Sequence, residues 1–453
     1  MRIGVEAAGL PDKRLRKRAG QMVEQMSRSP EKTLPEIFGE WKEIKAAYRF
    51  LDNERVTHEG LMKGQSAETY QRIRERGEKL VLLVQDSTDF DFSHHPHSEG
   101  MGRLENEHMS GFLVHSTLAV SGHGVPLGLV GQQVWVREEE TAGQRHQRHK
   151  RPFEEKESYK WVKGLPTAAE SGQAVQQVTV CDREADIYEF FDEVLSRDMD
   201  FIVRATRDRD LDTGQGKLFA QLRQLPVAQS YTLQLQRRPD REPRPAQVEL
   251  RYGSLTVKAP RRAKTERPSL TVQVVEVYEP HPPQGDAGVH WVLLTSLPVT
   301  SLEEARQVVE WYTYRWLIER FHYVLKSGCR LEERQLRERP RLERLLGLFN
   351  LVAWNLLWLT YQARQTPDAS CEVVLATPEW QALYAYIRRT RQLPSSPPTL
   401  RQATRWIAQL GGFLGRKGDG DPGVKVLWRG WQRLQDIVAA WQIFSSSLDV
   451  GNA

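Results

Sequence analysis

Apolar runs rich in β-branched residues recur between about residues 78 and 210 and predict the strands of a sheet. The runs are KLVLLVQDST, GFLVHSTLAVSG, VPLGLVGQQVWVR, VQQVTVCD and DFIVRAT. A segment with helical spacing, READIYEFFDEVLSR, interrupts them before the last strand. Because strands that alternate with helical segments are typical of α/β folds, the pattern predicts an α/β sheet of mixed direction.

The pattern changes after this region. From about residue 211 to 290, polar and apolar positions alternate between charged and proline-rich turns, which predicts an antiparallel β insertion. Residues 291–299, WVLLTSLPV, return to the pattern of a buried strand. The stretch from Leu302 to Ser327 then contains neither glycine nor proline and predicts one long amphipathic helix.

Both ends of the chain are predicted to be helical. Apolar side chains fall at helical spacing over residues 44–51, and Asp52 and Asn53 follow as terminating residues. Beyond Pro367 the sequence is helical again, rich in tryptophan and interrupted by glycine and proline. We therefore predict an amino-terminal helical domain over residues 1–65, an α/β domain over 66–366 and a carboxy-terminal helical domain over 367–453.

Composition adds a bias toward polyanions. The 453 residues are 39% hydrophobic, which is enough to bury a large core, and the net charge of +5 corresponds to a pI near 9.0. The cations cluster at Lys13 to Arg18, Arg145 to Arg151 and Lys258 to Arg267. Several basic clusters along one chain favour a long polyanion over a small acidic metabolite, with solvated loops as the alternative.

Cysteine usage and hydropathy bear on the compartment. Three cysteines without CxxC or Cys/His spacing are too few for a disulfide framework or a zinc site, so we expect reduced thiols and a cytoplasmic protein. The amino terminus lacks the apolar core of a signal peptide. Leu345 to Tyr361 is the most apolar segment, but it is short for a membrane span and contains Asn350 and Asn355, so we predict a core helix and no membrane.

Three acidic residues in three separate segments are the strongest candidates for chemistry. Asp86 and Asp182 each follow an apolar run, so we expect both carboxylates at the carboxyl ends of buried strands. Glu319 lies in the predicted helix after residue 302 and is expected to project onto those strands. Crowded carboxylates repel one another, but their hard oxygens suit Mg²⁺ or Mn²⁺ at phosphate-processing sites, so the trio predicts two-metal phosphoryl transfer.

A spacing around Glu319 is more specific. Tyr312, Arg315, Glu319 and Lys326 form the pattern Y-x2-R-x3-E-x6-K, with Arg315, Glu319 and Lys326 one and two helical turns apart and so on one face. An ordinary salt-bridged helix is the alternative, but it does not predict carboxylates on separate strands. The pattern resembles the signature of the cut-and-paste DDE transposases of insertion-sequence family four.

The resemblance extends over nearly the whole chain. The texts AAYRFLDN, EKES, DREADIY, HWVLLTSLPV, LGGF and WRGWQRL are similar to that family and occur in the same order. It implies an RNase H-like core with an antiparallel β insertion, flanked by an amino-terminal domain that binds DNA ends and a carboxy-terminal dimerisation domain. It further implies that Asp86, Asp182 and Glu319 are the catalytic ligands of two Mg²⁺ or Mn²⁺ ions.

The same resemblance implies roles in DNA binding for four other residues. Tyr312, Arg315 and Lys326 are expected to hold the phosphate next to the cleaved end. Trp291 corresponds to the tryptophan on which a flipped base stacks when the element's end is folded into a hairpin. A tryptophan at the start of a buried strand can also be an ordinary core residue, which is the alternative for Trp291.

Other candidates carry less. After Asp182, Arg183 and Glu184 could orient the metal site, whereas Asp186 is expected to cap a turn or face solvent. The histidines of SHHPH, at 94, 95 and 97, are predicted to lie in a polar loop, and His115 is predicted to be a satisfied, partly buried histidine. The tail tryptophans 428, 431 and 441 form either an exposed face for dimerisation or part of the core.

The sequence therefore predicts a metal-dependent DNA transposase that excises its own insertion sequence through a nick, a hairpin and hairpin opening, and then joins it to target DNA. Its partners are double-stranded DNA at the terminal repeats and the target, and a second copy of the chain. The resemblance implies a bacterial cytoplasmic protein that acts at the nucleoid. The alternatives are a catalytically inactive DNA-binding or dimerising inhibitor and an RNase H-like nuclease.

Overall fold

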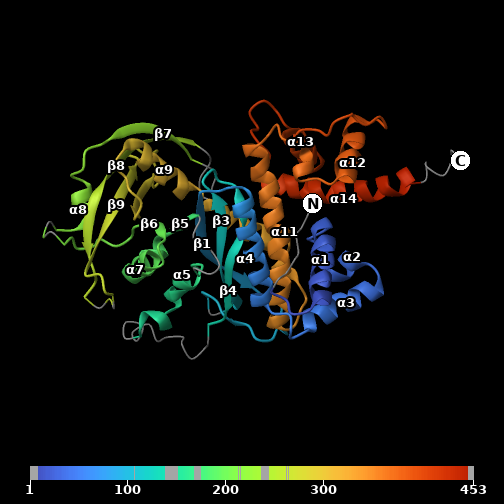
Figure 1. Cartoon of the computed structure of the whole chain (residues 1–453), viewed down its shortest axis with the longest axis horizontal. Helices are drawn as coiled ribbons and strands as arrows, with labels where there is room; N and C mark the ends of the chain where they lie inside the picture. Colours follow the sequence, from blue (N-terminus) through green and yellow to red (C-terminus); the bar gives the residue numbers. More distant parts are fainter. Residues whose placement is uncertain are drawn as a thin grey trace.

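The computed structural model describes residues 9–106, 108–137, 151–167, 175–212, 214, 216–235, 244–261, 263 and 265–446. Within this part of the chain, ten strands form one mixed sheet (Figure 1). The strands are β1 (Leu80–Asp91), β2 (Gly102–Arg103), β3 (Ser110–Ser121), β4 (Pro126–Trp135), β5 (Gln176–Cys181), β6 (Asp200–Arg204), β7 (Gln229–Leu235), β8 (Arg244–Lys258), β9 (Ser269–Tyr278) and β10 (His290–Thr295).

The order across the sheet is β2-β3-β1-β5-β6-β10-β9-β8-β7, and β4 also pairs with β3. Among these described strands, only β1 with β5 and β5 with β6 pair in parallel, so the predicted mixed direction is confirmed. Strands β7 to β10 form an antiparallel meander that continues the central sheet on the side of β6. The predicted insertion therefore extends the same sheet, because β9 and β10 carry its hydrogen-bond ladder across to β6.

Helices precede, interrupt and follow the strands. The longer ones are α1 (Lys13–Arg28), α2 (Leu34–Phe38), α3 (Trp41–Asp52), α4 (His58–Glu75), α5 (Lys160–Lys163), α7 (Tyr188–Ser196), α8 (Leu218–Leu222), α9 (Leu302–Thr313), α10 (Trp316–Tyr323), α11 (Arg339–Gln365), α12 (Thr377–Arg388), α13 (Leu400–Leu410) and α14 (Val424–Ser446). Single 3₁₀ turns are η3 (Phe153–Glu155), η4 (Glu157–Tyr159), η5 (Arg183–Ala185), η7 (Leu331–Glu333) and η8 (Cys371–Val373), and η6 (Val324–Gly328) is a π turn. The predicted end of a helix at Asp52 and Asn53 is confirmed by α3.

Helix α11 separates the sheet from the terminal helices. It packs against β4 and α4 on one side, and α1 to α3 and α12 to α14 lie beyond it (Figure 1). Of the described helices, α11 is the one long and apolar enough to cross a membrane by length and composition, and 83% of its apolar window is buried within the fold. The predicted core helix over Leu345 to Tyr361 is thus found in the core, with Asn350 and Asn355 also buried.

The carboxy-terminal helices cross at two glycines. A Cβ added to Gly430 of α14 would lie 1.6 Å from the carbonyl oxygen of Ile407, and one added to Gly411 would lie 1.9 Å from that of Val426. The two backbones can approach this closely only because Gly411 and Gly430 have no side chain. One contact between α13 and α14 therefore explains both the first glycine of LGGF, Gly411, and the glycine of WRGWQRL, Gly430.

One prediction about a helical segment needs correction. The stretch from Leu302 to Ser327 is not one α-helix, because α9 ends at Thr313 and α10 begins at Trp316. Between them, Tyr314 and Arg315 keep helical φ and ψ, but their backbone N–H groups bond three residues back, to Trp311 and Tyr312, each at 3.1 Å. The sequence contains no glycine or proline there, so the pattern gave no sign of this tighter turn.

The tail tryptophans form no exposed face. Trp428 and Trp431 are buried, Trp441 packs partly against the core, and the indole of Trp431 donates to the carbonyl of Ser27 in α1 at 3.0 Å. Of the two alternatives, core packing is therefore correct for Trp428 and Trp431. The exposed apolar residues of α14 are instead Ile443 and Phe444.

Candidate active site

Asp86 and Asp182 lie at the same level of two neighbouring parallel strands. Val84 of β1 pairs with Val180 of β5, and each aspartate follows its valine by two residues. Asp86 is not at the end of its strand, as the sequence analysis expected, because β1 continues to Asp91 through its pairing with β3. The two aspartates therefore lie side by side where β5 ends, at Cys181.

The Asp182 side chain also shapes the chain that follows it. It accepts a hydrogen bond from the backbone N–H of Glu184 at 2.9 Å and thereby caps the 3₁₀ turn η5. The Glu184 carboxylate points elsewhere and pairs with Lys160 at 3.1 Å. Glu184 thus contacts the segment that carries α5, and the structure shows no contact between its side chain and Asp86 or Glu319.

Glu319 reaches the strands through an arginine. It lies in α10, and Arg315, the residue just before this helix, pairs with its carboxylate. The same guanidinium lies 3.6 Å from Asp86, measured from Nη1 to Oδ2. Arg315 therefore joins the acidic residue of the helix to that of β1, and one cation partly neutralises two carboxylates.

The charges of Asp182 and Glu319 act on Asp86. Burial raises the pKa of Asp86 to about 7, Arg315 opposes this shift, and the charges of Asp182 and Glu319 add to it. Asp86 is therefore the carboxylate on which the other two acidic residues act, although each comes from a different element. Repulsion of this kind stabilises no fold, which favours a role in binding a cation.

The donor set fits a hard divalent cation in its chemistry, since carboxylate oxygens are the ligands that Mg²⁺ and Mn²⁺ prefer. In the residues that the structure describes, however, no group of three or more histidines, cysteines, aspartates or glutamates is close enough together to hold a metal ion. Arg315 instead occupies the space between Asp86 and Glu319. A metal site at these carboxylates accordingly requires that Arg315 give up at least one of its two partners.

A cavity of about 840 Å³ opens beside Arg315. Trp291, on β10, forms one wall, and its ring meets that of the buried Tyr312 edge-on, with centroids 5.4 Å apart. Further aromatic and cationic side chains also line it, among them Arg204, Tyr231, Arg306 and Trp316. Aromatic faces mixed with arginines suit a nucleobase together with its phosphate.

Lys326 is held away from Glu319. It lies in the π turn η6, where the wider turn breaks the α-helical spacing that the sequence analysis assumed. Its ammonium pairs with Asp89 at 2.8 Å and Glu332 at 3.4 Å. Of the three residues expected on one face, Arg315 and Glu319 are therefore in contact, and Lys326 contacts other carboxylates near the same end of β1.

A buried polar network lies directly behind the carboxylates. His322, one turn after Glu319, bonds to the hydroxyl of Ser116 at 3.2 Å, and Ser116 is the cross-strand neighbour of Asp86. Gln132 donates to the same hydroxyl at 3.0 Å and bonds to His58 at 2.8 Å. The network ties α10 to three other elements, β3, β4 and α4, and it positions Glu319 relative to Asp86.

His115 and His322 are buried in the neutral form, and His58 is half-buried. Burial lowers the pKa of His58, lowers that of His115 well below its usual range, and lowers that of His322 to about 3. The two ring nitrogens of His115 contact Ser87 and Gln85, both at 2.9 Å, so this histidine is satisfied, as predicted.

This network predicts a loss of stability in acid. Below pH 6.5 the unfolded chain binds protons at His115 and His322, whereas the folded chain keeps both rings neutral until the pH is far lower. The free energy of unfolding therefore falls as the pH falls, by up to about 1.4 kcal/mol per pH unit for each of these two rings. Urea unfolding at pH 7 and pH 5 should show that His322→Gln flattens this dependence by one proton. His94→Gln, in an exposed loop, is the control, and an unchanged slope for His322→Gln would contradict the assignment.

One minor prediction was wrong and one holds. Asp186 is neither a simple cap nor exposed, because it is buried, pairs with the buried Arg209 and accepts the backbone N–H groups of Thr206 and Arg207, each at 2.7 Å. The SHHPH histidines lie in a loop, where His95 bonds to the carbonyl of Glu332. Of the basic clusters, Lys13 to Arg18 falls on α1, whereas residues 145–150 lie outside the described part of the chain.

Sequence analysis missed Arg204 and Trp316. Arg204 ends β6, and it lines both the aromatic cavity and a cavity of about 200 Å³ that Asp182, Arg315 and Glu319 also line. It carries a usable signal, since a cation at the end of the strand DFIVR occupies the same kind of position as Asp182. Trp316 lines both cavities too. It is the first residue of α10, and its place at the cavities depends on where that helix begins.

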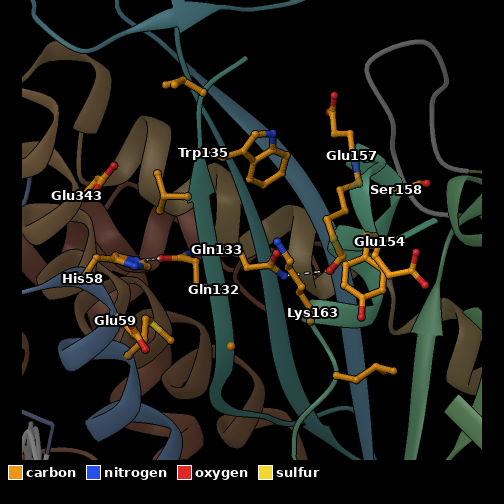
Figure 2. A pocket seen from close by; sticks show the side chains of 18 of the residues that line it. His58, Glu59, Gln132, Gln133, Trp135, Glu154, Glu157, Ser158, Lys163 and Glu343 are labelled. Carbon is orange, nitrogen blue, oxygen red and sulfur yellow. Dashed lines mark hydrogen bonds between the residues drawn. The ribbon is translucent and has the colours of Figure 1, made fainter. Parts of the chain in front are cut away.

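A larger cavity, of about 1,210 Å³, lies across β4 and away from these residues (Figure 2). Figure 2 shows His58 and Glu59 of α4 on one side of the strand and Lys163 with the η3–η4 segment on the other. Its lining mixes lysines and arginines with several glutamates, and neither Asp86, Asp182 nor Glu319 contributes. Such mixed charge favours no ligand of one sign, so the carboxylate edge remains the candidate site.

Comparisons with known proteins give three segments of the chain a counterpart. Residues 3–56 match a family described as transposase DNA-binding, residues 160–356 match the transposase DDE domain, and residues 351–449 match the transposase Tn5 dimerisation domain. Asp182 and Glu319 lie inside the DDE match, whereas Asp86 precedes its first residue. Among solved structures, the chain is similar to the piggyBac transposase in a cryo-EM structure of its synaptic complex with hairpin DNA.

That similarity is distant. The two share 10% sequence identity with a TM-score of 0.32, over 66% of this chain and 54% of the other. The chain therefore spans about half the length of that protein, and a score this low does not establish a shared fold. The three domain matches do not depend on it.

The matches define the class of protein: an enzyme that acts on DNA and carries a transposase DDE domain. The flanking segments match a transposase DNA-binding domain and the transposase Tn5 dimerisation domain. The predictions of an enzyme, of DNA as a partner and of dimerisation are confirmed at the level of these domains. Enzymes with a DDE domain depend on divalent metal ions, which agrees with the predicted Mg²⁺ or Mn²⁺.

Proposed function

We propose that this protein is a cut-and-paste DNA transposase that excises and inserts its own insertion sequence. The observation that carries the proposal is the meeting of Asp86, Asp182 and Glu319 from two strands and a helix, beside a cavity lined by aromatic and cationic side chains. We assign the chain to the Y-x2-R-x3-E-x6-K branch of insertion-sequence family four, similar to the transposase of the kanamycin-resistance composite transposon. The mixed sheet is then an RNase H-like core.

Each carboxylate has a role in this proposal. Asp86, Asp182 and Glu319 would hold two Mg²⁺ or Mn²⁺ ions, which activate a water or a 3′-hydroxyl and stabilise the leaving oxygen. Before the ions bind, Arg315 partly neutralises Asp86 and Glu319. Because its guanidinium can then turn to a phosphate oxygen, Arg315 exchanges a carboxylate for the substrate without an uncompensated charge.

Neighbouring groups position the DNA strand. Tyr312 and Arg315 border the carboxylates and would hold the phosphate next to the cleaved end. Lys326, which pairs with Asp89 of β1, would contact the same strand of DNA. Trp291 exposes a face to the cavity in which a base displaced from the duplex can stack. This arrangement supports hairpin formation, in which the freed 3′-hydroxyl attacks the opposite strand.

The rest of the chain supplies partners. We propose that residues 1–65 bind the terminal repeats, that residues 66–366 form the catalytic domain and that residues 367–453 dimerise, with exposed Ile443 and Phe444 of α14 available to a second copy. The three described cysteines are buried and free, which suits the reducing cytoplasm of a bacterium where the chromosome lies.

The test uses the purified protein and a labelled duplex that carries an end of its own element, resolved on a denaturing gel. Nicked, hairpin and strand-transfer products should form with Mg²⁺ or Mn²⁺ and disappear when EDTA removes the ions. The Trp291→Ala variant should still nick the duplex, but its yield of hairpin should fall about tenfold or more, because base stacking contributes about 1–3 kcal/mol. Tyr386→Ala, an exposed aromatic residue of α12, is the matched control.

Two outcomes would replace the proposal with its alternatives. Specific binding of the ends without metal-dependent cleavage would indicate a DNA-binding or dimerising inhibitor. Metal-dependent nicking without hairpin or strand-transfer products would indicate an RNase H-like nuclease. A transposase must hold a cut end in place for transfer, whereas hydrolysis needs only water.

A further inference from the structure

Besides the aromatic cavity and the small cavity of about 200 Å³, a third cavity, of about 240 Å³, adjoins the carboxylates on the other face of the sheet. Trp291 of β10 lines the aromatic cavity, whereas its neighbours His290 and Val292 line this one. Successive side chains of a strand point to opposite faces, so the two cavities lie on opposite faces at β10. Arg204 pairs with Leu293 of β10 and lines both cavities.

The small cavity containing Asp182 and Glu319 shares lining residues with both. Arg204, Tyr312, Arg315 and Trp316 also line the aromatic cavity, and Arg183 and Arg204 also line the third cavity. The three cavities therefore adjoin one another around the carboxylates. A single strand bound at the carboxylates has room on both sides of the reacting phosphate.

The third cavity is cationic. Arg183 follows Asp182, and Arg223 follows α8, and both side chains are exposed without a hydrogen bond or ion pair to any residue that the structure describes. The carboxylate in the lining, Glu276, is buried and already bonded to Arg251 at 3.0 Å and to His290 at 2.9 Å. The two exposed arginines consequently have no counter-ion within the described chain.

The lining also indicates what part of a nucleic acid fits. The aromatic cavity offers indole and phenol faces for bases. The third cavity has Phe219 as its one phenyl, indole or phenol ring and is otherwise bordered by arginines, His290, the already bonded Glu276 and small or aliphatic groups. Guanidinium groups bind phosphate oxygens in pairs of hydrogen bonds, and such backbone contacts carry no sequence information. The lining favours phosphodiester groups over bases.

We propose that Arg183 and Arg223 form a subsite for the phosphodiester backbone of the DNA strand that leaves the carboxylates on this second face of the sheet. The inference rests on the proposed function. Two DNA segments have this chemistry: the target strand that receives the element's 3′-end and the flanking DNA next to an uncut end. The arms of the experiment distinguish them.

The test compares the full chain with the Arg183→Ala/Arg223→Ala double variant. One arm joins a pre-cut element end to a target plasmid, and the other nicks an uncut duplex with long flanking DNA. We expect activity to fall about tenfold or more in at least one arm. For that arm's DNA, the slope of the logarithm of the binding constant against the logarithm of the salt concentration should be shallower by about 0.9 for each phosphate that the variant no longer neutralises. The Arg183→Lys/Arg223→Lys variant keeps both charges and should retain most of the salt dependence.

Lys217→Ala provides the matched control, because this exposed lysine lies at the start of α8, away from the cavity that Arg223 borders at the end of the same helix. A fall in the target arm assigns the subsite to target DNA, and a fall in the flanking arm assigns it to flanking DNA. Wild-type rates and salt dependence in both arms would overturn the subsite while leaving the transposase intact. An inactive wild type would overturn the proposed function itself.

Discussion

Glu319→Gln is expected to lower metal-dependent DNA cleavage and strand transfer by about 10³-fold or more, with little change in stability or in DNA binding. Glutamine keeps the size of the side chain but removes the charge that binds a cation. Arg315 would keep Asp86 as a partner, since its guanidinium already lies 3.6 Å from that carboxylate. The effect should therefore appear in the chemical steps and not in the fold.

Single-turnover assays with the element's end separate these effects. The rates of nicking and transfer should fall, whereas the affinity for the end and the urea midpoint should stay close to those of the wild type. Glu303→Gln is the control, because Glu303 is an exposed glutamate in the first turn of α9. Nicking by Glu319→Gln at the wild-type rate would remove Glu319 from the catalytic site.

Asp186→Ala is expected to destabilise the protein by about 3–5 kcal/mol, the usual cost of leaving a buried charge without its partner. The side chains of Asp186 and Arg209 are 0% and 4% exposed. The substitution also removes the acceptor of the Thr206 and Arg207 N–H groups. These bonds fix the turn after Asp182 against the segment that follows Arg204, so transposition should weaken as well.

Urea unfolding measures the first effect, and a double substitution shows its origin. Asp186→Leu combined with Arg209→Met should recover much of the stability, because it removes both charges from the interior. Asp210→Ala, an exposed carboxylate next to Arg209, should change stability by less than about 0.5 kcal/mol. A small effect of Asp186→Ala would mean that water reaches the pair.

Several elements could be predicted because each is encoded over a short stretch. The strands at Asp86 and Asp182 follow from apolar runs, and the capping box of Ser301 and Glu304 marks the start of α9. The break between α9 and α10 could not be predicted, because Tyr314 and Arg315 tighten to bonds three residues back without a glycine or proline to mark the change. The π turn at Lys326 was also missed.

The partners of polar side chains were the least predictable. Asp186 looked like a solvent-facing residue in the sequence, but its partner Arg209 lies 23 residues away, beyond a helix and a strand. The same holds for His322 of α10, whose partner Ser116 lies on β3, 206 residues earlier in the chain. Which polar side chain meets which is decided by the packing of elements and not by spacing along the chain.

The sequence by itself determined the class of fold, the helical ends, the three candidate carboxylates and the Y-x2-R-x3-E-x6-K spacing, because residue type and period are local properties. Only the tertiary structure decided that Asp86 and Asp182 share one level of adjacent strands, that Arg315 holds Asp86 and Glu319, and that cavities lie on both faces of the sheet at β10. The physical reason is that strand register and helix docking are set by burial of apolar surface across the whole domain, which no short segment contains.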